Sequence, residues 1–320
     1  MGFSIGRRFA GTQAMNPVYL DTARMLAQVA PLVFVDDTFA LKGGTAINLF
    51  VRDMPRLSVD LDLVFPDYSL PRDRALARIQ GAIREAAARL GRRGFTVHIP
   101  DADVSETRLL VRRGRIEVKV EANFVMRGTV KPVGRASFTA AARDRLFADV
   151  EIPVVSLEDM YGGKLNAALD RQHPRDLFDV MQLYANEGIT PGIRRAFVMY
   201  LESGKRPIHE LLFPQLRDIR HDYTYNFQGM TAEPVSLEAL LEVRERMIRQ
   251  VQKELDDNER RFLLSLVSSE PEWSLLGISH LEHLPGIRRK LHNLQQLRKT
   301  NARKFAEQTD ALTAGFAKVV

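Results

Sequence analysis

The chain opens with apolar residues at helical spacing and then alternates short apolar runs with further helical segments. Apolar positions that recur every three or four residues predict helices over residues 17–30 and 72–90. Short apolar runs that end at glycine or polar residues predict strands. The predicted strands lie at residues 39–41, 58–65 and 95–99, and a short helix is predicted at residues 46–51.

A hairpin pattern follows these elements. Strands are predicted at residues 107–112 and 115–124, on either side of a turn at Arg113-Gly114. Successive side chains of a strand point to opposite faces, so Ile116, Val118 and Val120 share an apolar face. The opposite face is polar and carries Glu117, Lys119 and Glu121.

The remainder of the chain has helical spacing almost throughout. The segment from Ser156 to Asp159 fits a capping box, which predicts a helix from that point to Arg171. Further helices are predicted at residues 174–185, 191–202, 236–268 and 285–315, with a polar and aromatic loop at residues 221–232. The pattern therefore predicts an α+β protein, with a mixed-sheet α/β domain over residues 1–155 and a mainly helical domain over residues 156–320.

Strand alternation places two carboxylates side by side. Ser58, Asp60 and Asp62 share one face of the predicted strand, while apolar residues fill the other face. Neighbouring carboxylates repel each other, and such oxygen ligands suit a divalent cation, for which Mg²⁺ is the expected cofactor. A single Asp-x-Asp pair is also common on strands that face solvent, so this pattern alone does not identify a metal site.

A glycine pair precedes these aspartates at a predicted strand-to-helix turn. Gly43-Gly44-Thr45 would allow a phosphate group to approach the backbone, and the N-terminus of the following helix offers unpaired N–H groups. This triplet is also a common turn when it stands alone. Together with the aspartate pair it predicts metal-assisted phosphoryl or nucleotidyl transfer.

A second polar cluster lies in the helical half. Lys164 and Arg171 share a helix face, and Arg175 opens the next helix, on which Asp176 and Asp179 share a face. The basic residues can hold the phosphates of a nucleoside triphosphate (NTP), with Asp176 orienting Lys164 or Arg171. The same residues would also suit an ordinary pair of capped helices, since acids in a first turn complement the helix dipole.

Composition narrows these possibilities. The chain has no cysteine, which excludes disulfides, thiolate chemistry and cysteine-based zinc sites. Its net charge of +6 suits a polyanionic partner such as nucleic acid, but it also suits a merely basic, well-solvated surface. No apolar run approaches the roughly 18 residues that a membrane span needs. We therefore expect a cytoplasmic protein without a membrane partner.

The segments KGGTAINLF and RLSVDLDLVF resemble the signature of DNA polymerase β-type nucleotidyltransferases. In that superfamily a third carboxylate comes from a later, neighbouring strand. Glu121 and Glu117 are the candidates, and the segment VKVEANF favours Glu121, although an aspartate often stands at this position. The resemblance implies that Asp60, Asp62 and Glu121 bind Mg²⁺.

With the segment GGKLNAALDRQHPRDLFDV included, nearly the whole chain resembles the AbiEii family. Its members are nucleotidyltransferase-like toxins of type IV toxin–antitoxin and phage-abortive systems, and the MenT toxins are relatives. The match implies Lys164 as an NTP-contacting lysine and Asp176 as the essential acid of the last motif. The residues expected to bind the NTP are Gly43, Gly44, Thr45, Ser58, Lys164, Arg171 and Arg175.

The resemblance also suggests partners for the reaction. It implies an RNA acceptor, with the 3′ end of tRNA as the expected site, and a cognate antitoxin regulator. Two alternatives remain open on the sequence. The same site could attach a nucleotide to a protein hydroxyl, or the chain could be a nucleotide- or RNA-binding module without catalytic activity.

Overall fold

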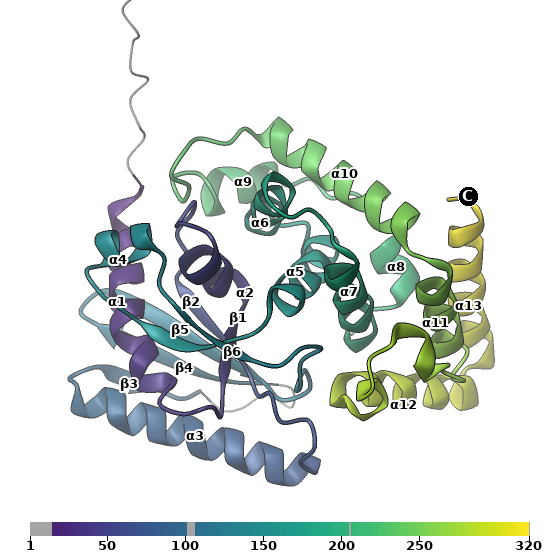
Figure 1. Ribbon diagram of the computed structural model, residues 1–320, viewed down its shortest axis with the longest axis horizontal. Coiled ribbons are helices and arrows are strands. Elements are labelled where there is room, and N and C mark those ends of the chain that lie inside the picture. The colour runs from purple at the N-terminus through teal and green to yellow at the C-terminus, as the bar shows by residue number, and fades with distance from the viewer. Residues whose placement is uncertain (1–14, 101–105, 205, 320) are drawn as a thin grey trace, which may run out of the picture.

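A computed structural model describes residues 15–100, 106–204 and 206–319 of the chain. The strands gather in one half of the molecule and most of the helices in the other, as Figure 1 shows. The predicted α+β fold is therefore confirmed. The last described strand ends at Val154 and the next helix begins at Leu157. The change from mixed strands and helices to helices alone therefore falls where the sequence pattern predicts it. The division into two domains stays a prediction.

One mixed sheet of seven strands forms in the described residues, in the order β3-β4-β5-β2-β1-β7-β6. The strands are β1 (Ala40–Lys42), β2 (Asp60–Val64), β3 (Thr96–His98), β4 (Glu106–Arg113), β5 (Ile116–Asn123), β6 (Gly134–Ser137) and β7 (Glu151–Val154). β2 pairs in parallel with β5, and β1 pairs in parallel with β7. The predicted hairpin is the antiparallel pair β4–β5, and its turn contains Gly114 at a φ of +61°.

Helices α1 (Pro17–Val33) and α3 (Arg72–Arg92) confirm the first two predicted helices. They contact each other and several strands of the sheet, and their apolar faces contribute Leu26, Ile79 and Ile83 to the core. The helix predicted at residues 46–51 begins earlier, with α2 (Gly43–Ala46), and continues as a π-helical turn, η1 (Ile47–Val51). Residues 134–154 contain β6, α4 (Ala140–Leu146) and β7, which the sequence pattern does not predict.

The helical half consists of α5 (Leu157–Arg171), α6 (Pro174–Ala185), α7 (Pro191–Ser203), α8 (Ile208–Leu212), α9 (Arg220–Asn226), α10 (Leu237–Glu254), α11 (Asp257–Val267), η2 (Trp273–Leu276), η3 (Leu281–His283), α12 (Pro285–Thr300) and α13 (Ala302–Ala317). α5 packs against α6 and α7 and also contacts α2, so it joins the helical half to the sheet half. Among the described residues, no helix has both the length and the apolar character needed to cross a lipid bilayer.

Three predictions in this half are wrong in detail. The helix predicted at residues 236–268 is two helices, because Asp256 caps a new one after Leu255. The helix predicted at residues 285–315 also breaks, at Asn301, whose extended backbone and side-chain cap start α13. The loop predicted at residues 221–232 begins as helix α9. In the first two cases apolar spacing continues across the break, so periodicity alone does not show it.

Candidate active site

Asp60 and Asp62 lie on β2, near the middle of the sheet. Leu61 and Leu63 are buried on the opposite face, while both aspartates are only half-buried. Asp62 lies opposite Lys42 of β1 on one side and Glu121 of β5 on the other. The predicted alternation is therefore present, with an apolar back and a polar front.

The negative charge of the two aspartates is only partly offset by nearby cations. Burial raises the pKa of Asp60, and the charge of Asp62 raises it further, whereas Arg175 and other cations lower it only in part. A cation close to the pair would offset this repulsion. Carboxylates in this state are suited to hold a divalent ion.

The register separates the two candidates for the third carboxylate. Glu121 lies directly opposite Asp62, whereas Glu117 lies near the start of β5 and pairs with Arg112 of β4. Glu121 Oε1 also lies 3.8 Å from Nε of Arg108. Among the described residues no three acidic or histidine side chains are placed to hold a metal ion together. Glu121 thus shares the face of the aspartate pair without converging with it on one point.

The glycine turn is pressed against this face. Gly43 has a φ of +76°, and a Cβ on it would collide with Oδ2 of Asp62. A Cβ on Gly44 would lie 2.5 Å from Nη2 of Arg56 and 3.2 Å from Oγ of Ser58. Only glycine at both positions lets the turn approach β2 this closely.

Thr45 and Ser58 connect the turn to the strand. The Thr45 hydroxyl is buried, lies 2.9 Å from Ser58 Oγ and donates to the backbone carbonyl of Asp60 at 2.5 Å. Both side chains were expected to contact phosphate. Because their hydroxyls have partners inside the protein, their observed contacts fix the turn relative to Asp60.

Lys164 and two aspartates form a buried network behind the turn. Lys164 Nζ lies 3.0 Å from Oδ1 of Asp176 and 2.8 Å from Oδ2 of Asp179. Burial would raise the pKa of both aspartates, but the neighbouring cations outweigh it and hold both pKa values below their usual range. Burial lowers the pKa of Lys164 and the two carboxylates raise it, with a net increase. All three side chains are therefore charged.

Arg56 and Asn48 belong to this network and were missed by the sequence reasoning. Arg56 makes a bidentate pair with Asp179, with distances of 2.8 and 2.6 Å. Asn48 donates to Asp179 at 2.9 Å and to the carbonyl of Gly44 at 2.9 Å. A signal for Arg56 was present, because it continues the two-residue alternation of Ser58 and the aspartates toward the N-terminus.

Arg171 and Arg175 extend the network toward solvent. Arg171 pairs with Asp176 at 3.0 Å, while 63% of its side chain stays exposed. Arg175 is half-buried, and its charge acts on Asp60. Asp176 thus contacts both basic residues that it was expected to orient.

These groups meet at a pocket of about 290 Å³ between the two halves. Its lining includes Gly43, Asp62, Lys164 and Arg171, together with residues of α7 and of the N-terminus of α12. The pocket brings the strand carboxylate, the glycine turn and the basic helix face into one space. Its basic groups suit a small molecule that carries phosphate groups, and the carboxylate of Asp62 lies in the same space.

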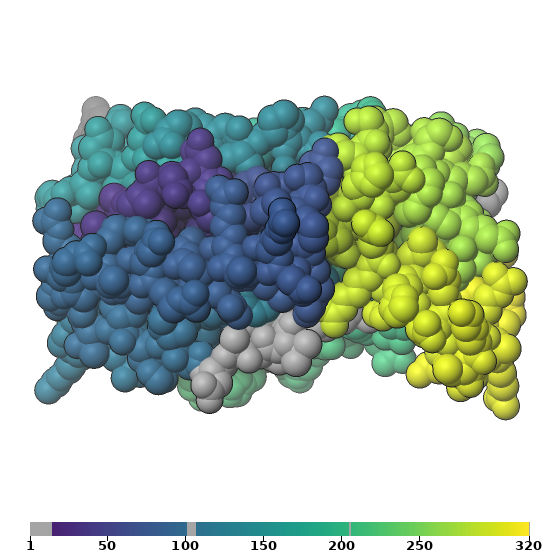
Figure 2. Space-filling model, turned by 90° about the horizontal axis from the view of Figure 1, so that it is seen from below, coloured from purple at the N-terminus to yellow at the C-terminus, as the bar shows by residue number. Residues whose placement is uncertain are grey.

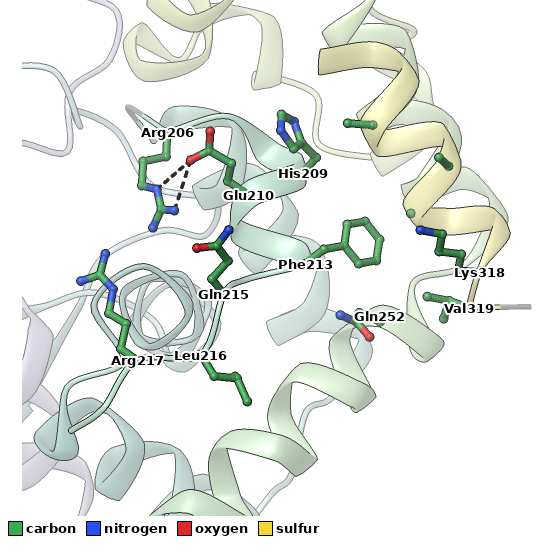
Figure 3. A pocket seen from close by; sticks show the side chains of 13 residues that line it. Arg206, His209, Glu210, Phe213, Gln215, Leu216, Arg217, Gln252, Lys318 and Val319 are labelled. Atoms are coloured by element: carbon green, nitrogen blue, oxygen red, sulfur yellow. Dashed lines mark hydrogen bonds and ion pairs between the residues drawn. The ribbon is translucent and has the colours of Figure 1, made fainter. Parts of the chain in front are cut away.

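A larger cavity, of about 970 Å³, lies within the helical half (Figure 3). Residues of α8, α10 and α13 line it, and none of the predicted site residues does. Its acid, Glu210, is paired with Arg206 at 3.2 Å, as the dashed lines show. The larger of these two pockets is therefore not the one that contains predicted site residues.

Comparison with known proteins gives the family of this chain. A sequence profile described as "Nucleotidyl transferase AbiEii toxin, Type IV TA system" matches residues 24–291. The fold is similar to that of MenT4, a nucleotidyltransferase toxin from Mycobacterium tuberculosis H37Rv, with a TM-score of 0.57 and 20% identity, over 87% of this chain and 94% of MenT4. A comparison with curated proteins gives no match. Because the profile spans most of the chain, this protein belongs to the AbiEii family of nucleotidyltransferase toxins of type IV toxin–antitoxin systems.

Proposed function

We propose that this protein transfers a nucleoside monophosphate from Mg²⁺-bound NTP to a hydroxyl at the 3′ end of tRNA. The observation that carries the proposal is the pocket that Asp62 and Gly43 share with Lys164 and Arg171. Nucleotidyl transfer needs a carboxylate that can bind a metal ion and cations for the phosphates in one space, and a pocket with an aspartate and two basic residues supports the proposal.

Asp60 and Asp62 are the residues suited to hold Mg²⁺. The ion commonly binds one or two carboxylates and completes its shell with water and phosphate oxygens, which suits a pair of neighbouring aspartates. When bound, it would stabilise the charge that develops on the phosphates. Glu121 would act as the third carboxylate, either toward the metal or as the acceptor of the hydroxyl proton.

The other residues bind and orient the nucleotide. The N–H groups of the Gly43-Gly44 turn would contact phosphate, and Thr45 and Ser58 would hold that turn against β2. Lys164 and Arg171 would balance the charge of the departing pyrophosphate. Asp176 keeps both cations in place, and Arg175 would support them near Asp60.

The experiment compares wild type with Asp62→Asn and with Asp144→Asn, a change at an exposed residue of α4. Each protein is incubated with each labelled NTP, with total RNA or with total protein. We expect label at the 3′ end of tRNA from the wild type and Asp144→Asn. The Asp62→Asn variant should stay folded and lose transfer by about a thousandfold, since a bound metal contributes several kcal/mol to the transition state.

Two results would contradict the proposal. If Asp62→Asn transferred nucleotide at the wild-type rate, Asp62 would not be needed to bind the metal ion. If the label entered protein rather than RNA, the acceptor would be a protein hydroxyl and not tRNA.

A further inference from the structure

Arg127 is a buried cation with unsatisfied hydrogen-bonding groups. It follows β5, its side chain is 6% exposed, and its Nε and Nη1 have no hydrogen-bond partner among the described residues. Burial and the nearby Arg72 lower the pKa of Arg127, and only Asp67 acts in the opposite direction. A guanidinium remains charged in proteins, so a buried one is costly unless an anion pairs with it.

The loop that carries Arg127 is firmly held. The N–H of Gly128 donates to the carbonyl of Phe65 at 2.9 Å. The N–H groups of Val130 and Lys131 donate to the carboxylate of Asp159 at 2.8 and 3.0 Å. The backbone that follows Arg127 is therefore fixed by the fold.

The N-terminus of α12 lies in the same place. This helix begins at Pro285, and its N-cap residue, Leu284, offers no side-chain acceptor to the first N–H groups. Leu284 and Gly286 line the catalytic pocket together with Arg127. An uncapped helix N-terminus carries a partial positive charge and unpaired N–H groups, which favour an anion.

A third cavity, of about 450 Å³, adjoins this point. Arg127 lines it as well as the catalytic pocket, and Arg72, His283 and Arg288 contribute further basic groups. Arg72 and Arg288 are exposed. The cavity is lined by residues 68–72 on one side and by residues from 283–288 on the other. Figure 2 shows that the N-terminal region and the C-terminal helices are in contact on this face of the molecule. Cationic groups thus extend from the surface to the catalytic pocket.

We propose that Arg127 and the N-terminus of α12 bind a backbone phosphate of the RNA acceptor, and that Arg72 and Arg288 guide the strand into the catalytic pocket. This inference rests on the proposed function. The planar guanidinium matches two phosphate oxygens at once. An NTP carries phosphates at one end only, and the glycine turn and Lys164 suit that end. A strand carries a phosphate at every nucleotide, which matches basic groups that continue to the surface.

The first test measures binding in the absence of NTP. A fluorescently labelled single-stranded RNA that ends in the tRNA 3′ sequence is titrated with wild type, Arg127→Gln and Arg74→Gln. Arg74 is exposed on α3 and serves as a matched control. We expect Arg127→Gln to weaken binding about tenfold and to reduce the slope of log K against log salt by roughly 0.7, the value for one phosphate contact to a single strand. Unchanged affinity and slope would overturn the inference.

The second test separates the acceptor from the NTP. Transfer kinetics should show a higher KM for RNA in Arg127→Gln, with the KM for NTP unchanged. A higher KM for NTP alone would assign the phosphate to the nucleotide and contradict the inference. A wild type that binds RNA but transfers no nucleotide to it would contradict the proposed function, while the binding comparison would still decide the role of Arg127.

Folding is monitored by thermal melting. We expect Arg127→Gln to melt no lower than wild type, because the change removes a buried charge without breaking a hydrogen bond. If this variant fails to fold, the double variant with Arg72→Gln and Arg288→Gln carries the same expectation for RNA binding, since both side chains are exposed. Wild-type affinity in that double variant would then overturn the inference.

Discussion

At the scale of single residues, Gly43 joins the backbone of the turn to the carboxylate that faces the pocket. Its φ of +76° and the collision of any Cβ with Asp62 both require glycine. We expect Gly43→Ala to reduce transfer at least tenfold and to lower the free energy of unfolding by about 1–3 kcal/mol. Transfer assays and urea unfolding would measure both effects.

The matched control for this change is Gly81→Ala. Gly81 lies within α3, and a Cβ there would meet no atom within 4 Å. Because alanine is the better helix former, this variant should be more stable than wild type by about 0.5–1 kcal/mol, with normal transfer. A Gly43→Ala variant that transferred nucleotide as well as Gly81→Ala would refute the role assigned to the turn.

Asp179 holds two buried cations, Arg56 and Lys164, and replacing it should be costly. We expect Asp179→Asn to lower the free energy of unfolding by about 3–5 kcal/mol, because it leaves buried positive charge uncompensated. Equilibrium unfolding in urea would measure the loss. A loss below about 1 kcal/mol would show that water reaches this network.

The same residue makes stability depend on pH. Burial would raise the pKa of Asp179, but Arg56 and Lys164 lower it below the ordinary value of 3.8. Between the lowered pKa and 3.8 the unfolded chain binds the extra proton, so stability falls as the pH decreases through that range. Urea unfolding should therefore show a steeper loss below about pH 4 in wild type than in Asp179→Asn. Equal slopes would contradict the assignment.

Alternation within one strand makes Asp60 and Asp62 predictable, because it depends only on neighbouring residues. Arg56 could have been found by the same rule. Its partner could not, since the Arg56–Asp179 pair joins positions 123 residues apart. Arg127 belongs to no motif, and its exposure and missing partners are properties of the folded molecule alone.

At the scale of elements, the break between α10 and α11 depends on a cap. Asp256 accepts from the N–H of Glu259, and the Glu259 side chain accepts from the N–H of Asp256. We expect Asp256→Ala to lower the free energy of unfolding by about 1–2 kcal/mol. Asn258→Ala, at an exposed position of the same turn, should change it little. Thermal melting of both variants would compare them, and equal melting temperatures would contradict the capping role.

A second prediction concerns the contact between α7 and α12. Glu202 is fully buried, its carboxylate has no hydrogen-bond partner among the described residues, and burial raises its pKa well above 4.5 despite Lys290. Because the pKa of Glu202 is higher in the folded than in the unfolded chain, its contribution to the free energy of unfolding is largest below the unfolded pKa. That contribution is lost as the pH rises toward the folded pKa. Glu202→Gln keeps the shape without the ionisable group. It should therefore stabilise the protein at pH 8 by about 1 kcal/mol or more, with a smaller gain near pH 4. Urea unfolding would measure the free energy of unfolding of both proteins at both pH values. An equal gain for Glu202→Gln at pH 4 and at pH 8 would contradict this account.

At the scale of the whole molecule, periodicity indicates which segments are helices or strands but not how they are ordered. The parallel pairing of β2 with β5 places Glu121 beside Asp62, and it depends on a connection that includes α3, β3 and β4. The candidate pocket likewise needs α5 and α12 to lie against the sheet half. Sequence reasoning therefore proposed the candidate residues, whereas the pocket that Gly43, Asp62, Lys164 and Arg171 line together is visible only in the fold.

Because both halves line this pocket, a bound nucleotide should hold them together. A ligand that binds only the folded state stabilises it by about 2.7 kcal/mol at a concentration of 100 times its dissociation constant. We expect NTP with Mg²⁺ to raise the melting temperature of wild type by several degrees and to have a smaller effect in EDTA. Asp62→Asn should lose the Mg²⁺-dependent part of this shift, and Asp144→Asn should keep it. An equal shift with and without Mg²⁺ would mean that the nucleotide binds without the aspartate pair, and the pocket would then serve for binding rather than for transfer.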